Sequence, residues 1–234
     1  MLQKLFAFFK KACAWFFVIS ILLVIIFRFV PVPFTPLMAF RAMENIKGDK
    51  ELEFSHHWVS IDNISPQMQK AVIASEDATF LDHHGFDFSA MRKAYKNNEK
   101  GRRMKGGSTI TQQTAKNVFL WQGRSYIRKA FEAYFTVLIE LFWPKQRIME
   151  VYLNSIEMGP NVYGAEAAAH HWYQVKAYQL TKQQAAGIAA ILPNPRKFKA
   201  KNSSGFIERR KSRIAKHMNY VKLDYSGATT DKNE

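Results

Sequence analysis

The chain has 234 residues, of which 47% are hydrophobic, and this is enough for one domain with a real core and one short additional element. The 34 Lys and Arg residues outnumber the 19 Asp and Glu residues, giving a formal charge of +15. A chain this basic predicts an anionic partner: nucleic acid, an anionic membrane surface or a phosphorylated substrate. Cys13 is the single cysteine, which excludes a fold stabilised by internal disulfides.

Residues 12–30 form an almost wholly apolar stretch, interrupted by Arg28 near its end. At about 1.5 Å per residue, a helix of this length nearly spans a hydrocarbon core of roughly 30 Å. Three lysines within residues 1–11 place this N-terminus in the cytoplasm by the positive-inside rule and the rest of the chain outside. A cleaved signal peptide is the alternative, but the stretch is long for one and no small-x-small cleavage site follows. We therefore predict a permanent single-pass anchor.

The external location argues against nucleic acid as the partner. The basic runs at 100–105 and 209–216 are more typical of solvated faces or of contacts to membrane phosphates. Residues 31–50 contain three prolines and predict a connector with one short helix. Residues 51–223 predict a mainly helical domain, and residues 224–234 a disordered tail.

Helix starts within this domain are marked by capping residues. Ser65 precedes Pro66, and Thr181 with Gln184 matches a capping box. Ser108 and Ser125 precede further apolar-periodic runs, and a last amphipathic helix is expected at about 205–221. Residues 57–61 are the best strand candidate, and residues 97–107 predict a mobile loop.

Residues 76–87 contain four carboxylates and two imidazoles around one glycine. A solvated turn is the simplest explanation of such a cluster. However, Met68, Val72 and Ile73 recur at helical spacing just upstream, so Glu76 is expected at the end of a packed helix. The negative end of the helix dipole and an apolar wall would both raise the pKa of Glu76 towards that of a working base.

Two glycines precede Ser108 at the expected start of a helix, where free N–H groups make an anion site. This signal is weak alone and is strengthened by Lys116 on the same helix. Further along, Arg128 and Glu132 are four residues apart and share a helix face. They form either a surface ion pair worth less than about 1 kcal/mol or a carboxylate held among cations that bind phosphate.

Residues 145–173 are interpreted mostly as scaffold, with small residues that allow close helix packing. The adjacent pairs His56-His57, His83-His84 and His170-His171 are poor metal signals, because neighbouring residues on a helix point about 100° apart. No structural metal site is expected.

Five segments match, in order and spacing, the motifs of the peptidoglycan glycosyltransferases. They are EDATFLDHHGFD (76–87), GGSTITQQTAKN (106–117), RKAFEAYFTVLIE (128–140), KQRIMEVYLNSIEMGPNVYGAEAAAHHWY (145–173) and AAGIAAILPNP (185–195). The chain resembles the monofunctional members, which have the anchor and the polymerase domain but no transpeptidase domain. Five ordered motifs over about residues 55–200 make this resemblance specific.

The resemblance implies a mainly α, lysozyme-like, two-lobed glycosyltransferase domain with an N-terminal transmembrane helix. It implies that lipid II and the growing lipid-linked strand are the substrates, β-1,4-linked glycan the product and undecaprenyl pyrophosphate the leaving group. Glu76 would be the general base, and Glu132 falls on the second family glutamate. The remaining expected binding residues are Asp77, Ser108, Gln112, Gln113, Lys116, Arg124 and Arg128. Ala78-Thr79 stands where many members have a basic residue, so a contact from that position is in doubt.

The expected leaving group needs positive charge and N–H donors, which argues for synthesis rather than hydrolysis of finished glycan. No cofactor is expected to be required; Mg²⁺ or Mn²⁺ would help to neutralise the phosphates, but no dedicated carboxylate site is evident. The expected location is the inner (cytoplasmic) membrane with the catalytic domain in the periplasm. A membrane-bound lytic enzyme and a non-catalytic scaffold that recruits other wall-synthesis or division proteins remain the alternatives.

Overall fold

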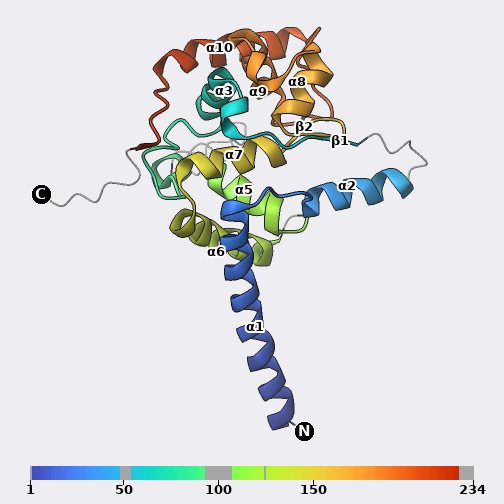
Figure 1. Ribbon diagram of the computed structural model, residues 1–234, viewed down its shortest axis with the longest axis vertical. Helices are drawn as coiled ribbons and strands as arrows, with labels where there is room; N and C mark the ends of the chain where they lie inside the picture. The colour runs from blue at the N-terminus through green and yellow to red at the C-terminus, as the bar shows by residue number, and fades with distance from the viewer. Residues whose placement is uncertain (1, 48–53, 93–106, 124, 227–234) are drawn as a thin grey trace, which may run out of the picture.

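The computed structural model describes residues 2–47, 54–92, 107–123 and 125–226 (Figure 1). The expected loop at 97–107, apart from Gly107, therefore lies outside the described residues, as does Arg124. The fold is mainly α, as predicted. Its helices are α1 Leu2–Phe29, α2 Pro36–Lys47, α3 Pro66–Glu76, α5 Ile110–Phe119, α6 Tyr126–Phe142, α7 Lys145–Ser155, α8 Ala165–Tyr173, α9 Lys182–Ile191 and α10 Gly205–His217. The strands are β1 Ser55–His56, β2 Glu157–Gly159 and β3 Val162–Tyr163, and 3₁₀ turns occupy Ile61–Asn63, Ala177–Gln179 and Met218–Tyr220.

Three helices begin at the capping residues from which the sequence predicted their starts. The hydroxyls of Ser65, Ser125 and Thr181 each accept a hydrogen bond from a backbone N–H in the first turn of α3, α6 and α9. Thr181 and Gln184 form the expected capping box. These caps satisfy N–H groups that a helix start leaves without intrahelical partners.

The three strands form one small sheet in the order β1-β3-β2. β3 runs parallel to β1 and antiparallel to β2. The predicted strand at 57–61 is wrong: the strand lies just before it, at Ser55–His56, because β3 offers its pairing edge only to those two residues. The next residues are held instead by Asn154, whose side chain bonds to both the N–H and the C=O of Val59 at 3.0 and 2.9 Å.

Helix α1 projects from the body of the molecule like a stalk (Figure 1). Residues 3–29 are long and apolar enough to cross a membrane, and the helix begins ten residues before the apolar stretch at 12–30. Its C-terminal half also packs on the domain. The indole N–H of Trp143 donates to the carbonyl of Val24 at 2.7 Å, and Arg147 donates to the carbonyl of Phe27 at 2.9 Å. Helix α1 is therefore part of the folded body at this end.

The remaining helices pack as two groups with the small sheet at one side. Helices α3, α9 and α10 pack on one another, and α5 packs on α6 and α7, with α1 against α6. In Figure 1 the α3–α9–α10 group lies at the end of the molecule opposite the α1 stalk, and α5 and α6 lie beside the stalk. The C-terminal end of α3 therefore faces the α5 group.

The connector contains one helix, α2, which is twelve residues long. Ion pairs attach it to the domain: Arg41 lies 3.3 Å from Glu157, and Glu44 lies 3.2 Å from Arg196. Burial raises the pKa of Glu157, although the two arginines lower it. The connector is thus fixed to the sheet rather than being a free spacer.

Tyr225 packs on the domain, although it falls within the disordered tail predicted at 224–234. The hydroxyl of Tyr225 donates to the side-chain oxygen of Gln69 at 2.8 Å, and its ring packs against the core. The sequence did not predict this contact because burial of a terminal aromatic side chain depends on the surface that the folded domain presents to it. Residues 227–234 lie outside the described residues.

Candidate active site

Glu76 is the last residue of α3, at the end of a packed helix as predicted. Met68, Val72 and Ile73 are buried on the face that α3 turns to the core. The side chain of Glu76 is 16% exposed, so it is mostly buried but still accessible to solvent. The helix thus presents one carboxylate at the junction of the two helix groups.

Within the described residues, three groups contact the Glu76 carboxylate, and each contact is long for a hydrogen bond or an ion pair. Gln113 Nε2 and Ser75 Oγ lie at 3.4 Å, and Arg210 Nη2 lies at 3.5 Å. Burial raises the pKa of Glu76 by more than Arg210 and the two hydrogen bonds lower it. A carboxylate with a raised pKa that remains reachable is suited to accept a proton.

The Gln113 amide is itself oriented by a buried tyrosine. Tyr152 is fully buried, and its hydroxyl donates to Gln113 Oε1 at 3.2 Å. Burial raises the pKa of this phenol well above its ordinary value, with Glu76 and Asp77 adding to the effect. The phenol therefore stays a donor, and it leaves the amide nitrogen of Gln113 to face Glu76.

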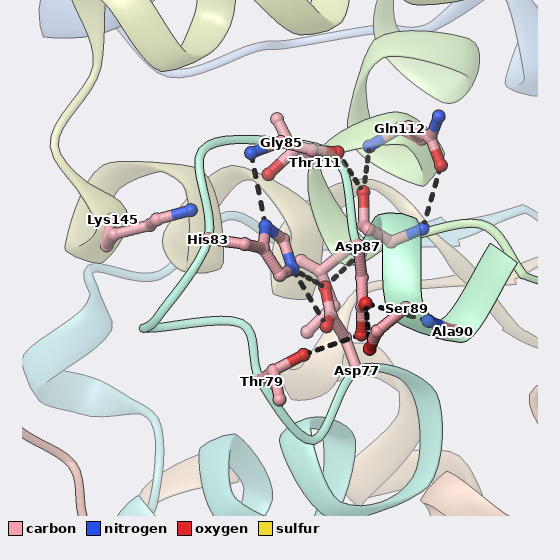
Figure 2. Close-up of polar contacts among 12 residues, drawn as sticks. Asp77, Thr79, His83, Gly85, Asp87, Ser89, Ala90, Thr111, Gln112 and Lys145 are labelled. Carbon is pink, nitrogen blue, oxygen red and sulfur yellow. Dashed lines mark hydrogen bonds and ion pairs between the residues drawn. The ribbon is translucent and has the colours of Figure 1, made fainter. Parts of the chain in front are cut away.

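Asp77, the next residue, is tied down much more tightly than Glu76. Its carboxylate accepts from the N–H of Ile110 at 2.9 Å and from His83 Nε2 at 3.0 Å, and the residue is only 7% exposed. His83 Nδ1 accepts from the N–H of Gly85 at 3.1 Å, so Nε2 is the nitrogen that donates (Figure 2). Asp77 thereby joins the end of α3 to the start of α5 and to the turn between them.

The turn after Asp77 is built by the other members of the acidic cluster. Asp87 accepts from Thr79 Oγ1, Ser89 Oγ and the N–H of Ala90, and these bonds lower its pKa to about 2 (Figure 2). Gly85 has φ +85°, and its carbonyl accepts from Thr109 Oγ1 at 2.7 Å. Of the four carboxylates in the cluster, Asp77 and Asp87 are bound within the turn, Asp82 is exposed, and Glu76 is the one that is partly buried and loosely held.

Helix α5 begins one residue later than predicted. Thr109, not Ser108, is the N-cap, and it forms a capping box with Gln112. The sequence Ser-Thr offers two competing caps, and Gln112 stands at the third helical position only if Thr109 is chosen. Gln112 is 3% exposed with its amide oxygen committed to this cap, so it fixes the start of the helix. Ser108 lies just outside, 3.4 Å from Lys129 Nζ.

A second carboxylate, Glu132, lies among cations on α6. Glu132 is 3% exposed and pairs with Arg128 Nη1 at 2.8 Å and with Lys129. The surface ion-pair interpretation is therefore wrong, because this carboxylate is buried. Burial lowers the pKa of Lys116, the proximity of Arg128 and Lys129 lowers it further, and Glu132 opposes both. Three cations thus surround one carboxylate, which leaves net positive charge for an anionic ligand.

Helix α5 connects the two carboxylate centres. Gln113 and Lys116 are three residues apart and so lie on one face of α5. Gln113 reaches Glu76, and Lys116 interacts electrostatically with Glu132. Glu76 and the cationic group around Glu132 therefore both lie along this face of α5. Of the predicted residues, only Arg124 cannot be placed.

Sequence reasoning missed Arg210, which is the one cation in contact with Glu76 within the described chain. It belongs to the basic run at 209–216 that was interpreted as a solvated face or a membrane contact. A signal was available: Arg210 lies three residues after Ile207 and four before Ile214, both buried, which places it towards the inner side of α10.

A partly buried carboxylate with a raised pKa, beside a cationic group, is suited to accept a proton from an anionic substrate. Comparison with known proteins agrees with a site of that kind. Residues 43–219 match the family model described as Transglycosylase. The biosynthetic peptidoglycan transglycosylase of Caulobacter vibrioides is 54% identical over 201 residues, covering 86% of this chain and 85% of that protein. The protein of the same name from Bacteroides thetaiotaomicron is 50% identical over 220 residues, covering 94% and 89%. The chain therefore belongs to the transglycosylase family.

Proposed function

We propose that the protein polymerises lipid II into β-1,4-linked glycan strands and releases undecaprenyl pyrophosphate. The observation that carries this proposal is the buried Glu76 carboxylate, loosely held and facing the same helix that presents Lys116. The family match and the names of the relatives, biosynthetic peptidoglycan transglycosylases, support it.

In the proposed reaction, Glu76 takes the proton from the 4-hydroxyl of the acceptor sugar. The oxygen then attacks C1 of the donor sugar from the face opposite the leaving group, and the C1–O bond to pyrophosphate breaks with inversion. Because pyrophosphate leaves as an anion, it needs positive charge rather than a strong acid. Lys116 and Arg128, with Lys129 beside them, supply that charge.

We assign Glu132 an orienting role in this reaction. Its carboxylate is paired with Arg128 and Lys129, so it holds two cations in place. Asp77 positions Glu76 by fixing the turn, and Gln113 supports Glu76 directly. The Ser108 hydroxyl and Arg124 are proposed as further contacts to the pyrophosphate side of the donor.

We also propose that α1 is a single-pass anchor in the inner membrane with residues 1–11 in the cytoplasm and the domain in the periplasm. Three lysines near the N-terminus support this orientation. No cofactor is proposed, and among the described residues no three His, Cys, Asp or Glu side chains gather as metal ligands would. Polymerisation that persists in EDTA would agree with this, whereas strict Mg²⁺ or Mn²⁺ dependence would mean that a cation assists the phosphates.

The test is polymerisation of purified lipid II by the full chain and by Glu76→Gln. Loss of a general base predicts a fall in rate of about 10²- to 10⁴-fold. Glu208→Gln, an exposed glutamate on α10, is the matched control and should retain the rate. An undiminished rate in Glu76→Gln would overturn Glu76 as the base, and breakdown of mature glycan without polymerisation would favour the lytic alternative.

The variant should also be no less stable than the wild type. A carboxyl group whose pKa is raised in the folded state favours folding below that pKa and opposes it as pH rises through it. At pH 7 the Glu76 charge therefore costs folding free energy, and Gln carries no such cost. A thermal unfolding temperature at pH 7 equal to or above that of the wild type separates lost chemistry from lost structure.

A further inference from the structure

A cavity of about 200 Å³ lies on α10, away from the Lys116 group. Its lining residues are Phe206, Arg209, Arg210 and Arg213. Arg210 belongs both to this cavity and to the candidate active site, because its Nη2 lies 3.5 Å from Glu76 Oε1. The cavity is thus a neighbour of the candidate active site.

The cavity is strongly cationic. Arg209 and Arg213 are exposed and form no ion pair with any residue that the structure describes. Arg210 Nε is buried and has no hydrogen-bond partner in the described chain. The nearby carboxylate of Glu208 is engaged elsewhere, by Ser203 at 2.5 Å and Lys211 at 3.7 Å. Three guanidinium groups around one small cavity favour an anion with planar, two-oxygen geometry.

The position of α10 in the fold separates the two kinds of anion that lipid II carries. In Figure 1, α10 lies at the end of the molecule farthest from α1, the proposed membrane helix. The pyrophosphate is joined to a prenyl chain that stays in the membrane, so it belongs with α5 and α6, beside α1. Lipid II is a disaccharide-pentapeptide on undecaprenyl pyrophosphate, so its sugar also carries a peptide, here called the stem peptide. Because Arg210 lines the cavity and contacts Glu76, a peptide carboxylate bound at α10 would lie near a sugar hydroxyl at Glu76.

We propose that the cavity formed by Phe206, Arg209, Arg210 and Arg213 binds a carboxylate of the stem peptide of lipid II. This inference rests on the proposed polymerase function and adds a subsite to it. Arg209 and Arg213 bind the carboxylate with their guanidinium forks. Arg210 connects the occupied subsite to Glu76, so that a substrate with its full peptide is held in register with the base.

The test compares two substrates and two double variants of the full-length protein. The substrates are lipid II and a lipid II analogue whose peptide carboxylates are all converted to carboxamides. For Arg209→Gln/Arg213→Gln we expect KM for lipid II to rise about tenfold, the loss of one charge-assisted interaction, with kcat unchanged. KM for the carboxamide analogue should be the same in this variant and in the wild type.

Lys201→Gln/Lys216→Gln is the matched control, because it removes the same charge from exposed positions outside the cavity and should leave both KM values unchanged. An equal rise of KM for both substrates in the arginine variant, or no rise for either, would overturn the subsite. If the wild type makes no polymer from either substrate, the proposed function itself fails. If polymer forms but the arginine variant changes KM equally for both substrates, only the subsite is rejected and the proposed function stands.

Discussion

Two neighbouring carboxylates at the end of α3 have different roles because their hydrogen bonds differ. Asp77 is held at 2.9–3.0 Å by Ile110 and His83, whereas the contacts of Glu76 are 3.4–3.5 Å long. Strong hydrogen bonds to a carboxylate fix its position. Asp77 thus has a structural role, and Glu76 remains able to exchange a proton with a substrate.

The balance of charges at Glu76 gives a pH prediction. With Glu76 as the proposed base, the rate should fall as pH drops through the Glu76 pKa, which burial raises above the ordinary value of 4.5. Arg210 lowers that pKa, so Arg210→Gln should move the acidic limb of the pH–rate profile to higher pH. Lys211→Gln is the control, because it removes the neighbouring positive charge, which pairs with Glu208. An acidic limb at the same pH in both variants would contradict the assigned interaction.

Gly85 gives a second prediction at this scale. Its φ is +85°, and a Cβ there would lie 2.7 Å from Thr136 Cγ2 and 2.9 Å from Glu140 Cγ. Gly123 has φ +120°, and a Cβ there would meet nothing within 4 Å. Both substitutions to Ala strain the backbone, but only Gly85→Ala adds overlap. We expect Gly85→Ala to destabilise the protein by about 1–3 kcal/mol more than Gly123→Ala in denaturant unfolding; equal losses would mean that the turn relaxes.

At the scale of elements, the helix starts could be predicted from the sequence because capping is local. Ser65, Ser125 and Thr181 each lie within three residues of the N–H groups that they satisfy. Glu76 could be placed at a helix end for the same reason. Arg210 could not be paired with it, since 134 residues separate the two and their contact depends on α10 packing against α3. The strand at Ser55–His56 was likewise fixed by a partner more than a hundred residues away.

Helices α6 and α7 are joined by a buried ion pair that supports the turn after Asp77. Lys145 Nζ lies 2.8 Å from Glu140 Oε1 and 4.7 Å from the centre of the Phe80 ring, and the two charged side chains are 4% and 8% exposed. Thr111 Oγ1 also donates to Glu140 Oε1, at 2.5 Å. Glu140 thus links α5, α6 and α7 behind the candidate site.

Lys145→Met should therefore be strongly destabilising, because it leaves the Glu140 carboxylate buried without its cation. We expect a loss of about 3–5 kcal/mol in the free energy of unfolding. Lys145→Met/Glu140→Gln removes the charge and keeps an acceptor for Thr111, so it should lose less than the single variant. Chemical denaturation of both variants checks this; a double variant that is less stable than Lys145→Met would reject the explanation.

At the scale of the whole molecule, the structure divides the chemistry along one axis. Helices α5 and α6 lie near the stalk, α3 ends at Glu76, and α10 lies at the far end (Figure 1). A substrate with a membrane-bound pyrophosphate, a sugar and a free peptide has its parts in the same order. Helix α1 fixes the direction of this axis for two reasons. It packs on the domain through the carbonyls of Val24 and Phe27, and it is long and apolar enough to cross a membrane.

Two truncations test whether the domain depends on the packing of the C-terminal half of α1. Removing residues 2–11 takes away only side chains that are exposed where the structure describes them, whereas removing residues 2–29 also takes away the carbonyl that accepts from Trp143 and the buried Val24. We expect the longer truncation to unfold about 5–10 °C lower in the same detergent, since each kcal/mol lost shifts the midpoint by about 2–4 °C at this size. Tryptophan fluorescence during heating measures both. Equal unfolding temperatures would mean that the domain does not depend on α1, and that the stalk only holds it at the membrane.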